Sequence, residues 1–182
     1  MMLVEIKKNK QIELRRVGEA DAGIITEYLS QLSTETRKRF GPHPYDIDSV
    51  NAFYKKMVHL GFIAMDIESN KIVGYAVIKM GYLEHDFTRL ENYGLGLDQL
   101  TDCCFAPSVA DNWQNQGVGN ALFDFVLEQV LFIGFSRIIL WGGVQASNEN
   151  AIQYYKKLGF ETLGSFEYQG LNYDMILNIG GA

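Results

Sequence analysis

The sequence predicts a mixed α/β fold, in which helices alternate with the strands of one mixed sheet. Apolar runs of strand length are interspersed with amphipathic helical stretches along the whole chain. Two pairs of strand-like runs are separated only by short polar turns, a pattern typical of antiparallel hairpins. Another pair is separated by a helix that begins with glycines, which is typical of two parallel strands joined by a right-handed crossover.

The bulk composition is that of one globular domain. The 182 residues are 47% hydrophobic and 21% charged, enough for one core and too few for two ordinary domains, so we expect a single domain over residues 1–182. The formal net charge of −6 argues against a nucleic-acid partner, because phosphate backbones are bound by clustered lysine and arginine. No apolar stretch resembles a signal peptide or a membrane span, so we expect a cytoplasmic protein with no membrane partner.

The cysteines and histidines do not indicate a metal site. Cys103 and Cys104 are adjacent, and neighbours in a strand point to opposite faces, so they are poor disulfide partners. The histidines are scattered along the chain: His43, His59 and His85. They match no usual ligand spacing, and we expect no metal.

The first third of the chain is predicted to be a strand followed by helices. Residues 12–17 have a strand pattern, and residues 19–29 open with acidic side chains and continue as an amphipathic helix. Residues 33–40 form a charged helical stretch that ends before Gly-Pro-His-Pro at 41–44. Asp48 is expected to cap a third helix that reaches about residue 60.

The middle of the chain is predicted to contain a hairpin, a long loop and a strand. Residues 62–68 and 71–79 are apolar runs around a Ser-Asn turn. Residues 80–96 show no clear period and are expected to form a loop. Residues 97–110 contain a strand, in which Pro107 should mark a bulge or a local break because it lacks an N–H group.

The last third is predicted to alternate helices and strands. A helix follows Gly117, and residues 137–141 form a continuous apolar run typical of a buried parallel strand. A helix over residues 150–158 precedes two strands at 161–168 and 171–179, which turn through Gln-Gly.

The helix after Gly117 begins in a way that suits an anion. The first N–H groups of a helix lack internal partners and the helix dipole is positive there, and Gly117 and Gly119 let a ligand approach the main chain. Glycines at a helix start also occur for packing alone. A dinucleotide fold would need a third glycine, and a Walker loop would end in Gly-Lys-Ser or Gly-Lys-Thr; neither pattern is present.

Two motifs in this region resemble those of the GNAT acetyltransferases. Residues 114–119, QNQGVG, match the family's Gln/Arg-x-x-Gly-x-Gly/Ala signature. Residues 148–160, NENAIQYYKKLGF, resemble its second signature, Asn-x-x-Ala-x-x-x-Tyr-x-x-x-Gly-Phe. Short patterns at residues 32–40 and 105–114 are also similar to the GNAT domain of bacterial protein-lysine acetyltransferases. The resemblance covers nearly the whole chain and implies the GNAT acyl-CoA N-acyltransferase fold, with splayed central parallel strands.

The resemblance implies acetyl-CoA as cosubstrate. Its site would lie in a gap between the strands at residues 101–110 and 137–144, with main-chain N–H groups near residues 106–110 polarising the thioester carbonyl. The residues expected to bind the cofactor are Ala106, Val109, Ala110, Gln114, Asn115, Gln116, Gly117, Val118, Gly119, Asn120, Asn148 and Tyr155. Asn148 is also expected to cap its helix, which alone would explain it.

The resemblance further implies that Tyr155 protonates the departing thiolate. A phenol with a pKa of about 10 is protonated at neutral pH and can return a proton to a thiolate whose conjugate acid has a pKa of about 8.5. The alternative is that Tyr155 only packs in the core, and its neighbour Tyr154 is expected to pack or to line the rim.

The base is harder to assign. Related lysine acetyltransferases carry a glutamate on the strand before the loop, where this chain has Cys104. Asp102, on the same strand face, is a candidate base acting through water, while solvated charge or helix capping is the competing interpretation. The other candidates come from the helical segment near the N-terminus: Glu35, His43 and Asp46.

These observations predict an acetyl-CoA-dependent N-acetyltransferase whose acceptor is a primary amine of a small molecule. The alternatives are a protein lysine or N-terminal acetyltransferase, and a non-catalytic module that senses acyl-CoA. A protein that uses the Gly117 loop for another phosphate is disfavoured by the second motif. Dimers are frequent in the family, so a homodimer is an open expectation.

Overall fold

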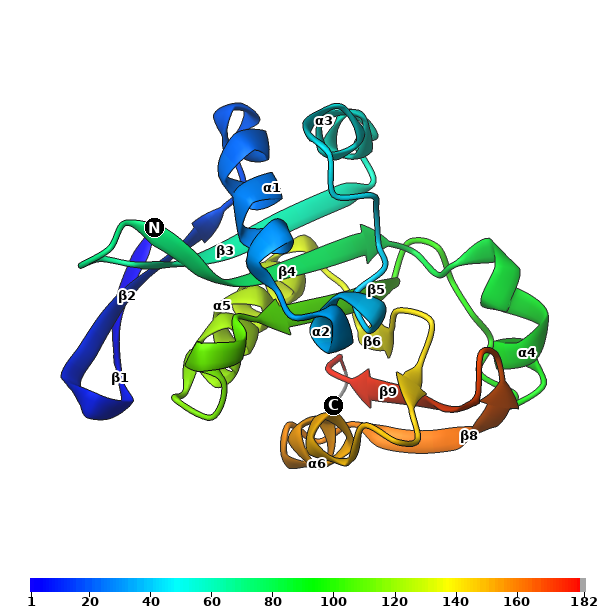
Figure 1. Cartoon of the computed structure of the whole chain (residues 1–182). Helices are drawn as coiled ribbons and strands as arrows, with labels where there is room; N and C mark the ends of the chain where they lie inside the picture. Colours follow the sequence, from blue (N-terminus) through cyan, green and yellow to red (C-terminus); the bar gives the residue numbers. More distant parts are fainter. Residues whose placement is uncertain (181–182) are drawn as a thin grey trace. The chain divides into compact units, whose positions relative to one another are not determined.

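The computed structural model describes residues 1–180 of the chain and has the mixed α/β architecture expected (Figure 1). The chain forms two compact units. The first comprises residues 1–78 and 106–129, and the second comprises residues 79–105 and the chain from residue 130 onward. Strands β4 and β5 and helix α5 each contribute residues to both units. The expectation of a single domain stays a prediction.

Five strands build the sheet of the first unit, in the order β1-β2-β3-β4-β5. They are β1 (Met2–Ile6), β2 (Lys10–Arg16), β3 (His59–Asp66), β4 (Lys71–Met80) and β5 (Asp102–Val109). The β1–β2 pair is antiparallel and runs from Met2↔Leu14 to Ile6↔Lys10. Strands β2 and β3 are also antiparallel.

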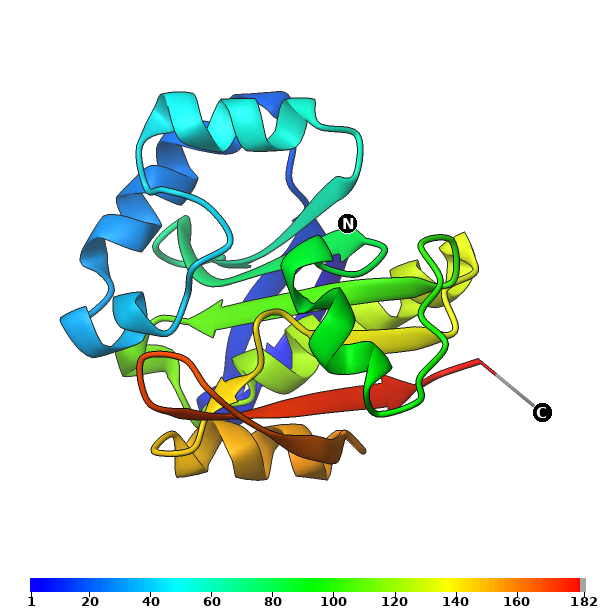
Figure 2. The same cartoon turned by 90° about the vertical axis from the view of Figure 1, so that its right-hand side faces the viewer.

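Helices cover both faces of this sheet. They are α1 (Ala22–Gln31), α2 (Thr34–Lys38), α3 (Ile47–Lys55) and the first part of α5 (Val118–Ile133). Figures 1 and 2 show α1 and α3 on one side of β3 and β4, and α5 on the other side. Gly74 on β4 allows the close approach of α5, because a Cβ atom at Gly74 would lie 2.9 Å from a methyl carbon of Val118.

The second unit contains the parallel pair of strands. Its strand order is β5-β6-β9-β7, with β8 paired to β9. The remaining elements are α4 (Phe87–Glu91), β6 (Arg137–Leu140), β7 (Val144–Gln145), α6 (Glu149–Lys157), β8 (Glu161–Glu167) and β9 (Leu171–Asn178). Strands β5 and β6 are parallel, as predicted, over the four pairs from Asp102↔Arg137 to Phe105↔Leu140.

Three local predictions were wrong. The sequence pattern missed β1, because this edge strand is mostly exposed and its turn, Lys7–Asn9, contains no glycine. Helix α3 is capped by Asp46 rather than Asp48 and ends at Lys55, because β3 begins at His59. The segment 80–96 is not only a loop, since it contains α4.

Pro107 does not interrupt its strand. β5 is continuous from Asp102 to Val109, so the local break is not present. The carbonyl of Phe105 accepts a hydrogen bond from the N–H of Trp141 in the direction of β6, whereas the N–H of Ala110 donates to Val73 of β4. Because main-chain groups alternate along a strand, Pro107 faces away from β4 and its missing N–H removes no bond to that strand.

Candidate active site

The loop before α5 has the backbone conformation expected of a glycine-opened helix start. Asn115 and Gly117 have positive φ values of 60° and 99°. Gly117 immediately precedes α5, and its carbonyl accepts the N–H of Ala121 at 3.0 Å. A side chain at Gly117 would be strained in this conformation, which is why glycine is required there.

Helix α5 starts differently from α2, α3 and α6, whereas α1 and α4 also start without a side-chain cap. The side chains of Ser33, Asp46 and Asn148 accept hydrogen bonds from the N–H groups at the starts of α2, α3 and α6. Gly117 precedes α5 and has no side chain with which to do the same. The positive end of the α5 dipole follows this glycine, and a phosphate fits the chemistry of such a helix start.

The polar side chains of this loop bind the loop itself. Gln114 donates from Nε2 to the carbonyl of Val109 at 3.3 Å, and Gln116 donates to the carbonyl of Asn112 at 2.5 Å. Within residues 1–180, the Oε1 atom of Gln116 is buried and accepts no hydrogen bond. Asn120 is exposed on α5. The predicted cofactor residues from Gln114 to Asn120 thus form one continuous segment of the first unit.

The main chain of β5 narrows the choice of ligand donors among the predicted residues. The N–H of Ala110 is used within the sheet, donating to the carbonyl of Val73 at 2.9 Å. By the alternation of the strand, Ala106 also faces β4, whereas Val109 faces away from it. Pro107 also points away from β4 but has no N–H group. Among residues 106–109, the main-chain N–H that points away from β4 is therefore that of Val109.

Asp111 connects this loop to α2. Its carboxylate accepts the N–H and the hydroxyl of Ser33 at 2.9 and 2.8 Å, and the hydroxyl of Thr36 at 2.6 Å. Burial raises the pKa of Asp111, but these hydrogen bonds outweigh it and lower the pKa below its ordinary value. The patterns around Ser33 and Asp111, which are separate in sequence, are therefore one contact in the structure.

Tyr155 lies on α6 in the second unit. It is buried, and its ring packs against Phe160 and Tyr154 with centroids 5.4 and 5.3 Å away. Burial raises the pKa of the Tyr155 hydroxyl above its ordinary value, so the phenol stays protonated at neutral pH. Asn148 caps the same helix by accepting the N–H of Ala151 at 3.3 Å.

Asp102 is engaged in a buried ion pair. Its two carboxylate oxygens accept hydrogen bonds from Nε and Nη2 of Arg137 at 2.8 and 2.7 Å. Oδ2 also accepts a hydrogen bond from the main-chain N–H of Asp98. Arg137 in turn donates to the carbonyls of Leu95 and Gly96. Asp102 is 0% exposed. The pair therefore fixes the segment before β5, and its geometry does not favour Asp102 as a base.

The other candidate bases also have partners. Glu35 on α2 pairs with Arg39, which follows the helix, at 2.6 Å. Asp46 accepts a hydrogen bond from the N–H of Ser49 at 2.9 Å. His43 is buried, with Nδ1 2.7 Å from the carbonyl of Pro44, so Nδ1 carries the proton. Its Nε2 then accepts the hydroxyl of Tyr75 at 2.7 Å.

Cys104, which the sequence resemblance aligns with a glutamate of related enzymes, belongs to the core. It packs with Leu83, Leu90, Ile139 and Ile176. Burial raises the pKa of its thiol to about 12, so it is not a thiolate at neutral pH. Cys103 is also buried and free.

Two properties of the described chain concern metals and membranes. Residues 1–180 include no cluster of three or more histidine, cysteine, aspartate or glutamate side chains suited to a metal ion. In the same range, no helix is both long enough and apolar enough to cross a bilayer.

Replacing Asp102 by Asn should destabilise the protein, because Arg137 would lose its buried counter-charge. We expect a loss of about 3 kcal/mol in the free energy of unfolding, measured by urea denaturation. Asp124→Asn, the same change at an exposed site of α5, is the control and should cost less than about 0.5 kcal/mol. Equal losses in the two variants would contradict a structural role for the ion pair.

Stability should fall on mild acidification because of His43. Burial lowers the pKa of His43, although the carbonyl of Pro44 partly opposes it. Below the unfolded value of about 6.5 the unfolded chain binds a proton that the folded chain does not, so stability falls by at most about 1.4 kcal/mol per pH unit until the folded pKa is reached. The dependence of the unfolding free energy on pH between 7.5 and 5.5 should be less steep in His43→Gln than in the wild-type protein, and an unchanged dependence would contradict the role of His43.

Comparison with solved structures supports the fold. The GNAT domain of PAT from S. lividans has a TM-score of 0.74 at 18% identity, covering 97% of this chain and 96% of that one. The yncA protein of Salmonella typhimurium, a putative acetyltransferase solved with its cofactor acetyl-CoA, gives 0.71 at 16% identity over 94% and 95%. A spermidine N-acetyltransferase chimera from Vibrio cholerae and hSSAT gives 0.65 at 17% identity over 92% and 95%.

Comparison of the sequence identifies the family. No curated protein matches the sequence. The family model described as Acetyltransferase (GNAT) family matches residues 26–160, which include β5, the Gly117 loop and α6. That range is more than half of the chain and contains both motifs, and the chain therefore belongs to the GNAT acetyltransferase family.

Proposed function

We propose that this protein is an N-acetyltransferase that moves the acetyl group of acetyl-CoA directly to a primary amine of a small molecule. The observation that carries the proposal is the QNQGVG segment, in which Gly117, with a φ of 99° and no side chain, stands immediately before the positive end of the α5 dipole. GNAT enzymes use acetyl-CoA, whose pyrophosphate is the kind of anion that such a helix start binds.

The cofactor would be held by main-chain groups of the first unit. N–H groups of residues 116–119 would bind the pyrophosphate, and the N–H of Val109 would bind the pantetheine arm or the thioester carbonyl. Ala106 and Ala110 have no main-chain donor role in this proposal, because the N–H of Ala110 donates to Val73 and Ala106 faces the same strand. Bound acetyl-CoA supplies the acetyl group as a thioester and leaves as the thiol.

Tyr155 is the general acid in this proposal. Its raised pKa keeps the hydroxyl protonated, so it can donate its proton to the sulfur atom that leaves. The proposal assigns no side chain as the base. Asp102, Glu35 and Asp46 are held by other partners, and the nitrogen of His43 that could take a proton already accepts the hydroxyl of Tyr75.

A small cationic amine is the acceptor we favour. The net charge of −6 attracts cations, and the similar structures include enzymes named for spermidine and for an aminoglycoside. A protein lysine or N-terminus is the second candidate, because the similar structures also include the ribosomal-protein-S18-alanine N-acetyltransferase of Escherichia coli. A module that only senses acyl-CoA would not need the protonated Tyr155.

Calorimetric titration tests the cofactor. We expect micromolar binding of acetyl-CoA and CoA and no comparable binding of NAD, because the α5 loop lacks the third glycine of a dinucleotide site. A panel of polyamines, aminoglycosides and lysine peptides then tests the acceptor, with release of free thiol as the readout. A preference for NAD, or no binding of CoA, would contradict the proposed function.

Replacing Tyr155 by Phe tests the general acid. The variant should lose about 100-fold or more in kcat on the best amine of the panel, because the leaving thiolate loses its proton donor. Binding of acetyl-CoA should change less than about twofold. Tyr154→Phe, the same change at the adjacent position, is the control and should keep its turnover. Unchanged turnover in Tyr155→Phe would refute the assignment.

A further inference from the structure

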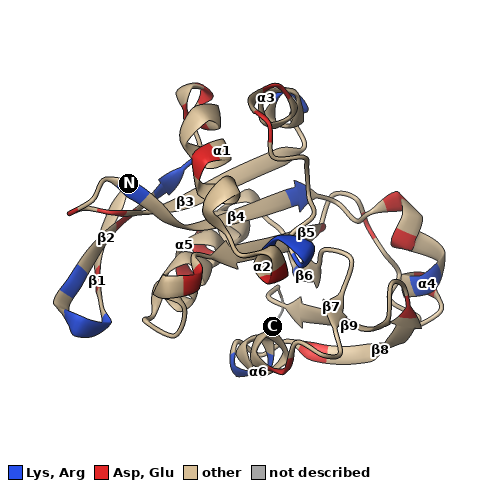
Figure 3. Cartoon of the chain, viewed as in Figure 1, with Lys and Arg blue, Asp and Glu red and all other residues tan. Residues whose placement is uncertain are grey.

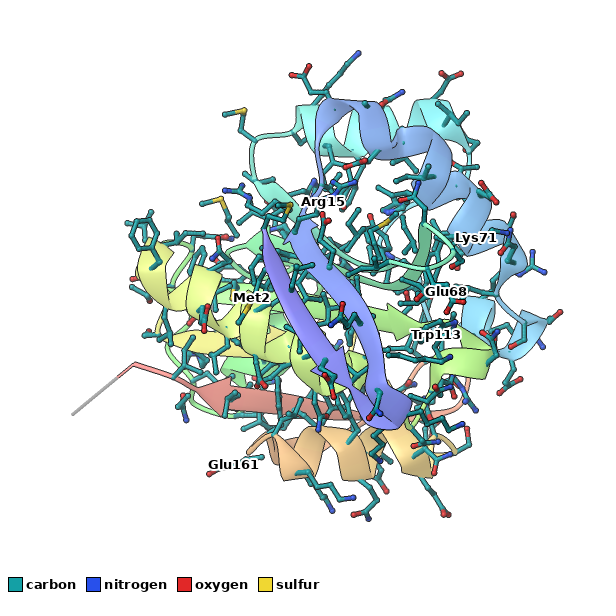
Figure 4. All side chains as sticks on the ribbon, turned by 90° about the vertical axis from the view of Figure 1, so that its left-hand side faces the viewer. Met2, Arg15, Glu68, Lys71, Trp113 and Glu161 are labelled. Carbon is teal, nitrogen blue, oxygen red and sulfur yellow. The ribbon has the colours of Figure 1, made fainter. Side chains whose placement is uncertain are left out.

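The N-terminal hairpin, strands β1 and β2 with their turn, contacts the Gly117 loop of the same unit. The main-chain N–H of Lys7 donates to the carbonyl of Gln116 at 3.1 Å, and its ammonium group donates to the carbonyl of Asn115 at 3.1 Å. The side chain of Ile6 lies 3.6 Å from where a Cβ atom of Gly117 would be. The ammonium group of Lys10 lies 3.7 Å from the ring centre of Trp113. Figure 4 looks onto this hairpin and labels Trp113.

These contacts orient two successive peptide groups of the loop. In a trans peptide the carbonyl and the N–H of the next residue point in opposite directions. Because Lys7 binds the carbonyls of Asn115 and Gln116, the N–H groups of Gln116 and Gly117 must point away from the hairpin. Successive N–H groups on one side of a loop with left-handed residues form an anion-binding concavity, which here leads directly into the start of α5.

The hairpin also brings positive charge to this point of an acidic chain. Its turn carries Lys7 and Lys8, and Lys10 begins β2. Figure 3 shows blue at the tip of the hairpin. The ammonium of Lys7 is hydrogen-bonded to the Asn115 carbonyl, which polarises that peptide group and makes its N–H a stronger donor. The hairpin lies outside residues 26–160, the part that matches the family model.

We propose that the hairpin forms the back wall of the pyrophosphate site and that Lys7 is a positioning residue for it. Lys7 holds the peptide groups of residues 115–117 with their N–H groups toward the phosphates, without itself contacting the cofactor. The inference rests on the proposed function, since it assumes that the loop binds the pyrophosphate of CoA. It adds a determinant of cofactor affinity from a segment that carries neither family motif.

The test is calorimetric titration of the full chain with CoA and with 3′-dephospho-CoA, which keeps the pyrophosphate and lacks the third phosphate. Lys7→Met retains the apolar stem and removes the ammonium group. We expect it to weaken the binding of both ligands by about five- to tenfold, the effect of losing one charge-assisted hydrogen bond at an exposed site. Lys7→Arg should restore the affinity to within about twofold, because a guanidinium can also donate to the Asn115 carbonyl.

Lys8→Met is the matched control, because it removes the same charge from the same turn but none of the contacts described above. It should change the affinity less than about twofold. Equal losses in Lys7→Met and Lys8→Met would overturn the inference in favour of a long-range charge effect. A loss confined to CoA would overturn it in favour of a direct contact with the 3′-phosphate. Thermal unfolding of each variant separates a loss of affinity from a loss of folding.

The outcome also separates this inference from the proposed function. If the wild-type protein binds CoA and Lys7→Met binds it equally well, the inference is wrong and the proposed function stands. If the wild-type protein binds neither ligand, the loop is not a pyrophosphate site and both fail. A loss in Lys7→Met that Lys7→Arg does not restore would also contradict the positioning role.

Discussion

The glycine-opened start of α5 is the constraint on which the rest of the candidate site depends. A helix that begins at a glycine with positive φ cannot cap itself with the side chain at that position. The surrounding segments hold this loop from two directions. Lys7 binds its carbonyls from the hairpin, and Gln116 and Gln114 bind carbonyls at and before its start. The main chain is thereby arranged to donate rather than to accept.

Several polar side chains that look catalytic in the sequence have structural roles. Asp102 and Arg137 neutralise each other in the interior and bind the segment before β5, since a buried carboxylate is stable only when its charge is paired. Asp111 gathers three donors from Ser33 and Thr36 and so joins α2 to the loop before α5. The same carboxylate chemistry that suits a general base also suits these tasks, and only the partners distinguish them.

Tyr155 is consistent with both packing and chemistry. Its ring contributes to the buried face of α6 against Phe160, and the same burial raises the pKa of the hydroxyl. A donor of protons needs its proton at neutral pH, so core packing and the proposed acid role do not conflict. His43 shows the opposite effect, because burial lowers its pKa and keeps the imidazole neutral beside Tyr75.

The sequence by itself determined the alternation of helices and strands, the parallel pair β5 and β6, and the glycine-opened start of α5. These follow from periodicity, chain order and the special conformation of glycine, all of which act over short distances. Only the tertiary structure decided that β1 exists, that Asp102 is paired with Arg137, 35 positions away in the chain, and that Lys7 contacts the Gly117 loop. The physical reason is that exposure, ion pairing and main-chain hydrogen bonds between distant segments leave no periodic pattern in the chain.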